Sequence, residues 1–288
     1  MKVWITGAGG MLGSCVARAL QRRDIAHRAS LCADVDISDG NAVADFMAAG
    51  GFTHIINAAA FTAVDRAEEE RDQASAVNNV AVGHLAEAAL AHDAVLLHVS
   101  TDYVFDGEAT TPYLEDAPTA PLGHYGASKL RGEQRLVGLL DGASMPYYIV
   151  RTSWLFGPDG NDFVGKMSAR LRGGESPRVV NDQKGRPTFA PDLAEGILAL
   201  LGVEGSPAPA GVYHFANSGE TSWHGLTLAI AERLGIDRER IVTVSSAEFP
   251  TDAPRPAYSV LDTSRFTAAP GRTPRPWPEA LAECVPGP

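Results

Sequence analysis

The chain has 288 residues, of which 45% are apolar and 20% are charged, an ordinary balance for a globular protein with a full hydrophobic core. Its 24 basic and 35 acidic residues give a formal net charge of -11, which argues against nucleic acid or an anionic membrane as the main partner. No apolar run reaches membrane-spanning length, and no signal-peptide pattern opens the chain. Three scattered cysteines favour a reducing cytoplasm, and we expect a cytoplasmic monomer or homodimer that holds no metal.

The first half of the chain alternates short apolar runs with longer amphipathic ones. Strands are predicted where a run is brief, apolar and bounded by polar or turn residues, at 3–5, 54–57, 95–99 and 147–151. Helices are predicted for the longer runs, at 11–22, 41–48, 74–91 and 128–140. This alternation indicates an α/β fold built on a Rossmann-type, doubly wound and mostly parallel sheet.

The sequence changes character after about residue 155. Glycine and proline become frequent, and helical patterns remain over 191–201 and 222–234, the second with Ser222 in the N-cap position. We therefore expect a Rossmann domain over residues 1–155, to which later segments return, and a smaller α/β domain over 156–288 that completes a cleft. The proline-rich stretch from Pro250 onward is expected to wrap the surface.

A glycine-rich turn follows the first predicted strand and opens the first predicted helix. Gly7, Gly10 and Gly13 are spaced so that the chain can turn tightly, approach a pyrophosphate and pack the helix closely on its strand. The amide groups at the helix start would then face the phosphates. Glycine turns also occur in proteins that bind no nucleotide, but the position and context here favour a dinucleotide site that includes Met11 and Leu12.

Two acidic residues lie about 20 residues beyond this turn, where an acid can bind the hydroxyls of the adenosine ribose. They are Asp34 and Asp36, and either could instead cap or turn a loop. Arg28 and Ser30 nearby could tolerate a 2′-phosphate, so the sequence leaves the choice between NADPH and NADH open. The small residues 58–60, after the second predicted strand, would let a cofactor lie close to the backbone.

Three polar residues predict the reaction chemistry. Thr101 follows the apolar run 95–99, at the edge where open α/β sheets bind ligands. Tyr125 and Lys129 share a helix face, so that the lysine cation can bring the tyrosine pKa down from about 10 and can also hold the cofactor ribose. A surface tyrosine beside a solvated lysine is the ordinary alternative. The glycine turn, the strand-end threonine and Tyr-x-x-x-Lys, in this order, favour a hydride-transferring reductase.

With these residues assembled, the chain resembles the dTDP-4-dehydrorhamnose reductases, a family within the extended short-chain dehydrogenases/reductases. The resemblance extends nearly from end to end. The segments that carry it are Val35–Asp39, Asn57–Glu68, Ser100–Gly107, Tyr125–Glu133, Arg151–Gly157, Asp182–Thr188 and Arg255–Pro256.

The resemblance implies that hydride passes from NADPH, with NADH as the alternative, to C4 of a dTDP-4-keto-6-deoxysugar such as dTDP-4-dehydro-L-rhamnose. Tyr125 would supply the proton, with Lys129 and Thr101 assisting, and the smaller domain would bind the sugar. The residues implied at the adenine and nicotinamide sides of the cofactor are Asp36, Ile37, Ala58, Ala59, Ala60, Phe61 and Thr62. The residues expected at the substrate are Thr101, Asp102, Tyr103, Trp154 and Arg255. Arg255 is included because a guanidinium suits the geometry of the nucleotide phosphates, and the alternative is an ordinary surface arginine.

Other activities share this framework. Nucleotide-sugar 4,6-dehydratases resemble one another in a Thr-Asp-Glu motif at the strand end, and Tyr103 replaces the glutamate here, which argues against elimination of water. A 4-epimerase remains an alternative, as does a non-catalytic NADP-binding regulatory subunit, although the intact Thr101, Tyr125 and Lys129 disfavour the latter. Two departures from the family concern local contacts: the segment 28–36 is shorter than in many relatives, and Asp162 interrupts an Asn-Phe-Val pattern.

Overall fold

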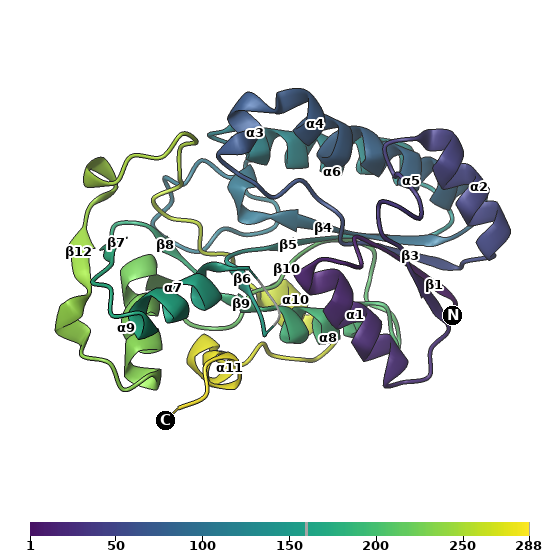
Figure 1. Cartoon of the computed structure of the whole chain (residues 1–288). Coiled ribbons are helices and arrows are strands. Elements are labelled where there is room, and N and C mark those ends of the chain that lie inside the picture. The colour runs from purple at the N-terminus through teal and green to yellow at the C-terminus, as the bar shows by residue number, and fades with distance from the viewer. Residues whose placement is uncertain (159–160, 288) are drawn as a thin grey trace.

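The computed structural model describes residues 1–158 and 161–287 of the chain. A six-stranded sheet with strand order β10-β5-β4-β3-β1-β2 lies at its centre, and every neighbouring pair in it is parallel (Figure 1). Its strands are β1 (Val3–Thr6), β2 (His27–Ala29), β3 (His54–Asn57), β4 (Val95–Thr101), β5 (Tyr147–Thr152) and β10 (Gly211–His214). The predicted α/β fold with a doubly wound parallel sheet is therefore confirmed.

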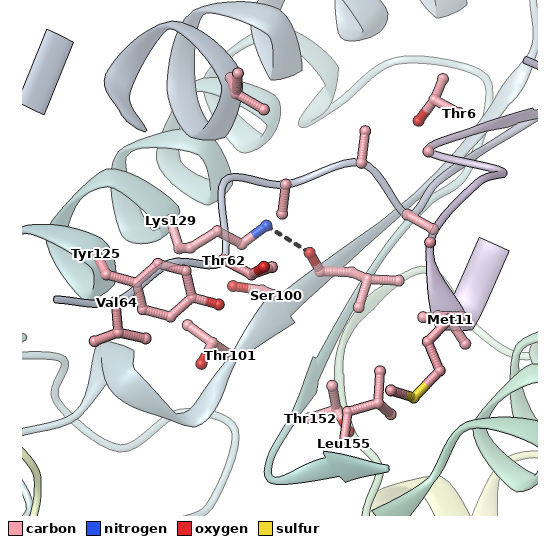
Figure 2. A pocket seen from close by; sticks show the side chains of 18 of the residues that line it. Thr6, Met11, Thr62, Val64, Ser100, Thr101, Tyr125, Lys129, Thr152 and Leu155 are labelled. Carbon is pink, nitrogen blue, oxygen red and sulfur yellow. Dashed lines mark hydrogen bonds between the residues drawn. The ribbon is translucent and has the colours of Figure 1, made fainter. Parts of the chain in front are cut away.

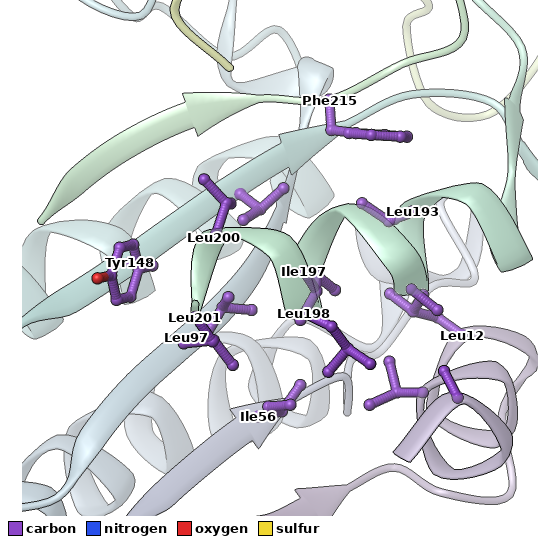
Figure 3. Packing of buried hydrophobic residues seen from close by; sticks show 14 of the residues in the cluster. Leu12, Ile56, Leu97, Tyr148, Leu193, Ile197, Leu198, Leu200, Leu201 and Phe215 are labelled. Carbon is purple, nitrogen blue, oxygen red and sulfur yellow. The ribbon is translucent and has the colours of Figure 1, made fainter. Parts of the chain in front are cut away.

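Helices cover both faces of this sheet, which is why its central strands are apolar throughout rather than alternating. On one face lie α1 (Met11–Gln21) and α8 (Ala190–Leu200), and on the other α2 (Gly40–Gly50), α5 (Ala81–Ala91) and α6 (His124–Leu140) (Figure 1). Figure 3 shows Ile197 and Leu198 of α8 on the side of the helix toward Ile56 and Leu97, and Leu193 on the side toward Phe215. The central sheet thus includes β10 and is covered by α8, both from beyond residue 155.

The predicted helix over 74–91 is interrupted. It is formed by α4 (Arg71–Ser75), a π-helical turn η1 (Ala76–Val80) and α5, and it follows the short α3 (Arg66–Glu69). The turn places the buried Asn78 side chain against Phe61, from whose N–H it accepts at 2.9 Å and to whose carbonyl it donates at 3.1 Å. The interruption is explained by this polar contact, which a regular helix pattern does not reveal.

Helix α6 begins four residues before its predicted start at Ser128. The N-cap residue of this helix is Gly123, which has no side chain that could cap it. The Glu68 carboxylate, from α3, accepts from the His124 N–H at 2.6 Å instead. This distant cap places Tyr125 in the first turn of the helix.

The rest of the chain packs around a separate core. Its short strands pair as β6 (Leu155–Phe156) with β9 (Thr188–Phe189), β7 (Arg178–Val180) with β12 (Val242–Val244), and β8 (Lys184–Gly185) with β11 (Thr221–Ser222). Its helices are α7 (Phe163–Arg172), α9 (Trp223–Arg233) and α11 (Trp277–Cys284), whereas the short α10 (Ser264–Ala268) packs against β10 of the central sheet through Phe266. The 3₁₀ turns are η2 (Asp102–Val104), η3 (Arg238–Arg240) and η4 (Ser246–Glu248). The helices predicted over 191–201 and 222–234 match α8 and α9, and the Ser222 hydroxyl does cap α9 by accepting from the Gly225 N–H at 2.9 Å.

The segment after Pro250 runs between the two parts of the molecule. Tyr258 bridges to Lys184 in the smaller part, and Leu261 bridges to Tyr113 beside the central sheet. The division into two domains at residue 155 stays a prediction. None of the described helices is both long and apolar enough to cross a membrane.

Candidate active site

A cavity of about 740 Å³ lies over the carboxyl ends of β1, β3, β4 and β5, and Trp154, Phe163 and Trp223 line its far side. Figure 2 shows how Thr101, Tyr125 and Lys129 gather at one end of it and Met11 and Leu155 at the other. The predicted site residues that line it are Gly7, Gly10, Met11, Leu12, Asp36, Ile37, Ala58, Ala59, Ala60, Thr62, Thr101, Asp102, Tyr103, Tyr125, Lys129 and Trp154. Gly13, Phe61 and Arg255 are not among the lining residues.

The glycine-rich turn fits a dinucleotide. Gly7 has a left-handed backbone (φ 66°), and a Cβ there would lie 2.6 Å from the Cα of Ala59. A Cβ on Gly13 would lie 2.3 Å from the Gly7 carbonyl oxygen, so Gly13 serves the close packing of α1 rather than the cavity wall. Helix α1 opens on the cavity with no side-chain cap at Gly10 and no acid in its first turn. Its first N–H groups and positive dipole end are therefore free to receive a phosphate.

The polar residues after β2 are engaged in local structure. The Asp34 carboxylate accepts from the Leu31 N–H at 2.8 Å, and a hydrogen bond from the Ser38 hydroxyl lowers the pKa of Asp36. The Ser30 hydroxyl is buried and accepts from the Trp4 indole at 2.8 Å. The Arg28 guanidinium lies over the Phe46 ring at 4.2 Å. Neither Arg28 nor the hydroxyl of Ser30 is thus held ready for a 2′-phosphate, contrary to the interpretation from sequence.

Tyr125 and Lys129 lie on the same face of α6, as their spacing predicts, but the lysine does not lower the tyrosine pKa. The Lys129 Nζ donates instead to the Val99 carbonyl on β4 at 2.7 Å, the dashed line in Figure 2. Burial raises the pKa of Tyr125 to about 12, opposed in part by its hydrogen bond with the Thr101 hydroxyl. The phenol is therefore protonated at neutral pH, the state that can donate a proton.

Buried polar atoms without partners gather where β4 and β5 end. Among the described residues, the Ser100 hydroxyl, the Thr152 hydroxyl and the Asp102 Oδ2 are buried with no hydrogen-bond partner, and all three residues line the cavity. Such groups are costly unless a ligand or ordered water satisfies them. Their position identifies this edge of the sheet as the place where a polar ligand binds.

The buried Asp102 carboxyl gives a testable pH dependence. Burial raises its pKa from 3.8 to about 7, so the folded protein binds this proton more tightly than the unfolded chain does. The stability associated with Asp102 is then greatest below pH 3.8, declines as pH rises through 7 and is constant above that. We expect Asp102→Asn to gain stability relative to the wild type across this window, measured as free energies of unfolding in urea at several pH values. A difference that does not change with pH would contradict the protonated carboxyl.

An aromatic stack forms the wall opposite Tyr125. The Trp154 and Trp223 rings lie 3.6 Å apart and nearly parallel, at 9°, and Phe163 packs on Trp223 with centroids 4.5 Å apart. Trp154 has a left-handed backbone (φ 47°), which is uncommon for a bulky residue and is typical of functional sites. Asp162, the residue that interrupts the Asn-Phe-Val pattern, caps α7 by accepting from the Gly165 N–H at 2.9 Å.

Arg255 lies beside the cavity and forms an ion pair. Its Nη2 donates to Asp65 at 2.8 Å, and its side chain is 17% exposed. Burial raises the pKa of Tyr103 and the charge of Arg255 opposes part of this rise, so the guanidinium lies within electrostatic reach of the cavity. Phe61 contributes backbone groups to the Asn78 contacts described above rather than to the wall.

Several residues that shape the site were missed by sequence reasoning. They are Asn57 with its side-chain contacts, Asn78, His98 and Trp223. Asn78 is a polar residue inside a predicted helix, which is a weak indication of a special role. His98 lies within an apolar run, where the sequence predicts only a buried strand residue. A partner on another element decides the role of each, and no local pattern contains that information.

The fold and the site together define an NAD(P)-dependent oxidoreductase of the short-chain dehydrogenase/reductase type. The model of the family described as RmlD substrate binding domain matches residues 1–287, and the chain belongs to this family. The chain is 43% identical to the dTDP-4-dehydrorhamnose reductase of Streptomyces griseus, over 98% of this chain and 92% of that protein. It is 39% identical to a probable dTDP-4,6-dihydroxy-2-methyloxan-3-one 4-ketoreductase of Streptomyces antibioticus, over 99% and 95%.

A solved structure extends the likeness to three dimensions. The dTDP-4-dehydrorhamnose reductase of Bacillus anthracis, in complex with NADP, superposes with a TM-score of 0.89 at 34% identity, over 98% of each chain. Structures of epimerases and dehydratases about 20% identical to this chain share the fold alone.

Proposed function

We propose that this protein reduces the 4-keto group of a dTDP-4-keto-6-deoxysugar, with dTDP-4-dehydro-L-rhamnose or a closely related sugar as substrate. The observation that carries the proposal is the protonated, partly buried Tyr125 phenol next to Thr101, at the sheet edge where buried polar atoms have no partner within the protein. The names of the relatives describe reductases of dTDP-linked keto-sugars, and the particular sugar differs between them.

The nicotinamide cofactor, when bound, would supply the hydride. The α1 N-terminus and Gly7 to Leu12 would hold its pyrophosphate, and Ala58 to Thr62 would line the nicotinamide side. Asp36 and Ile37 border the adenosine end.

Tyr125 would donate its phenolic proton to the oxygen of the reduced carbonyl, and Thr101 would orient that oxygen and the phenol. Lys129, 2% exposed at the floor of the cavity, would offer a cation to the developing phenolate and donors to the ribose. Asp102, Tyr103 and the Trp154 face would hold the sugar, and Arg255 would reach the nucleotide phosphates if it leaves Asp65. Burial raises the pKa of Tyr103, so its phenol stays protonated and cannot serve as the base that elimination of water requires. This favours reduction over dehydration.

We propose that the protein accepts NADPH and also uses NADH. Leu31 and Cys32 line the cavity directly after β2, where NAD-specific proteins place an acid, and the Asp34 carboxylate is occupied by the Leu31 N–H. The cavity wall directly after β2 therefore carries no carboxylate that would repel a 2′-phosphate, and Asp36, which also lines the cavity, would be left to bind the ribose hydroxyls of NADH. A cytoplasmic location, expected from the three scattered cysteines of the sequence, is part of the same proposal.

An acid at position 31 should change this preference. We expect Leu31→Asp to raise the KM for NADPH at least about tenfold, because two charges about 4 Å apart repel by roughly 1–4 kcal/mol near a surface. The KM for NADH should stay within about twofold. Leu31→Asn is the matched control, because asparagine has the shape of aspartate without its charge. An equal change for both cofactors in Leu31→Asp would refute this placement of the adenosine ribose.

The test of the proposed reaction is an NAD(P)H oxidation assay against a small panel of dTDP-4-keto sugars, run with each cofactor. Turnover with at least one of them, at one cofactor per sugar, is the expected result. Interconversion of 4-hydroxy epimers without net cofactor oxidation would favour the epimerase, and cofactor binding without turnover of any sugar would favour a regulatory subunit.

A further inference from the structure

A buried row of polar side chains crosses the central sheet beneath Lys129. The Thr6 hydroxyl on β1 donates to the Asn57 Oδ1 on β3 at 2.7 Å. The Asn57 Nδ2 lies 2.9 Å from the His98 Nδ1 on β4, and the His98 Nε2 lies 3.2 Å from the Lys129 Nζ on α6. None of these four residues is more than 2% exposed. Water therefore cannot satisfy their polar atoms, and each donor in the row must face an acceptor.

One backbone contact fixes the direction of these hydrogen bonds. The Ala59 N–H can only donate, and it lies 3.1 Å from the Asn57 Oδ1. That atom is therefore the carbonyl oxygen, and the amide nitrogen of Asn57 must donate to the His98 Nδ1. The Nδ1 is then an acceptor, so the single proton of a neutral His98 is on Nε2.

The proton on Nε2 points at Lys129. An ammonium has donors and no acceptor, so it would meet the His98 N–H as a second donor. A neutral amine instead accepts from the His98 Nε2 and donates to the Val99 carbonyl, and every group of the row is then satisfied. We infer that His98 is a positioning residue that favours the neutral amine of Lys129 in the cofactor-free protein, and that Lys129 takes up a proton when the cofactor binds.

The charged and titratable groups around Lys129 set the pH range in which the neutral amine forms. Burial lowers the pKa of Lys129 to about 8, and Glu133, one turn further along α6, opposes part of this decrease, so the neutral amine predominates above about pH 8. Glu133 is itself paired with Arg151 of β5 at 2.7 Å. Asp102, in η2 directly after β4, is largely neutral below its raised pKa of about 7, and the pKa of His98, on β4, is lowered well below 6.5 by burial and by Lys129.

The consequence concerns how the lysine becomes active. Once protonated, Lys129 cannot accept a hydrogen bond from the His98 N–H. The ammonium is then expected to turn toward the cavity, where Tyr125 and the ribose would lie. This inference rests on the proposed function, because the cofactor is the ligand that would favour the cation. The proton comes from solvent and adds to the Nζ lone pair, and no other bond changes.

Proton uptake on cofactor binding tests the inference without any turnover. We would titrate the wild-type protein with NADPH at about pH 8.5 by calorimetry in buffers of different ionisation enthalpy, since the 2′-phosphate, with a pKa of about 6, is fully ionised there. We expect uptake of about half a proton or more, and an affinity that falls as pH rises above 8. Binding with no uptake would overturn the inference, whereas a loss of sugar turnover alone would contradict only the proposed function.

A variant of His98 separates positioning from mere packing. The amide of His98→Gln can turn its oxygen to an ammonium, so the uptake should fall to less than about half of the wild-type value and the decline in affinity should move to higher pH. His54→Gln, a partly buried histidine at the other end of the parallel sheet whose Nδ1 contacts the Thr53 hydroxyl, is the matched control and should keep the wild-type uptake. Equal uptake in His98→Gln and the wild type would contradict the role of His98.

The tautomer of His98 can be observed directly in the wild-type protein, so the inference stays testable if His98→Gln fails to fold. Long-range ¹H–¹⁵N correlation spectra of ¹⁵N-histidine protein, without cofactor, should show His98 with a protonated Nε2 and an unprotonated Nδ1. A proton on Nδ1 would overturn the inference.

Discussion

Tyr125→Phe is expected to reduce kcat by about 10²–10⁴-fold, because general acid catalysis contributes a factor of this size. The phenol is partly buried, protonated and within reach of Thr101, and phenylalanine keeps the ring while removing the proton. Binding of the cofactor should change little, since the glycine turn and α1 would hold most of it. The measurement is single-turnover oxidation of NADPH with keto-sugar, alongside the Kd for NADPH by fluorescence.

Tyr147→Phe, a half-buried tyrosine at the start of β5, is the control for this substitution and should keep wild-type turnover. Wild-type turnover in Tyr125→Phe would refute Tyr125 as the proton donor. Equal losses of turnover and of cofactor affinity would instead show that Tyr125 acts mainly in binding.

The second large effect is on stability. Arg151 and Glu133 form a buried ion pair with side chains only 6% and 4% exposed, and it joins β5 to α6 next to the catalytic helix face. We expect Glu133→Leu to destabilise the protein by about 3–5 kcal/mol, because it leaves the Arg151 charge buried without its carboxylate. Urea unfolding at neutral pH gives the number.

The double variant Glu133→Leu with Arg151→Met is the informative comparison. Replacing both charges removes the unpaired ion, so the double variant should be more stable than Glu133→Leu alone. Additive losses in the two single variants would show that the pair is not coupled. Glu70→Leu, which removes the partner of the largely exposed Arg66, should cost no more than about 1 kcal/mol.

The sequence was most informative where function depends on spacing along one element. Gly7 to Gly13 and the Tyr125–Lys129 pair are each contained in one local pattern, and the helical spacing put both side chains on the same face of α6. The central strands were predictable because burial on both faces makes them uniformly apolar.

Contacts between distant elements could not be predicted in the same way. The sequence paired the Lys129 charge with Tyr125, but the structure turns Lys129 toward Val99 and His98 on β4. Helix α6 begins at His124 because Glu68 caps it from 56 residues away. Arg28 was considered for a phosphate, yet it stacks on Phe46 of a neighbouring helix. Each outcome depends on a partner that only the folded chain supplies.

On the proposed function, this site delivers hydride to C4 of a nucleotide-linked keto-sugar with net oxidation of the cofactor. Turnover of a dTDP-4-keto-6-deoxysugar with NADPH that carries deuterium at both C4 positions of the nicotinamide tests it most directly, with the product analysed by NMR. The account predicts one cofactor oxidised per sugar and deuterium at C4 of the sugar. Product formed with no net cofactor oxidation, or with deuterium absent from C4, would contradict it.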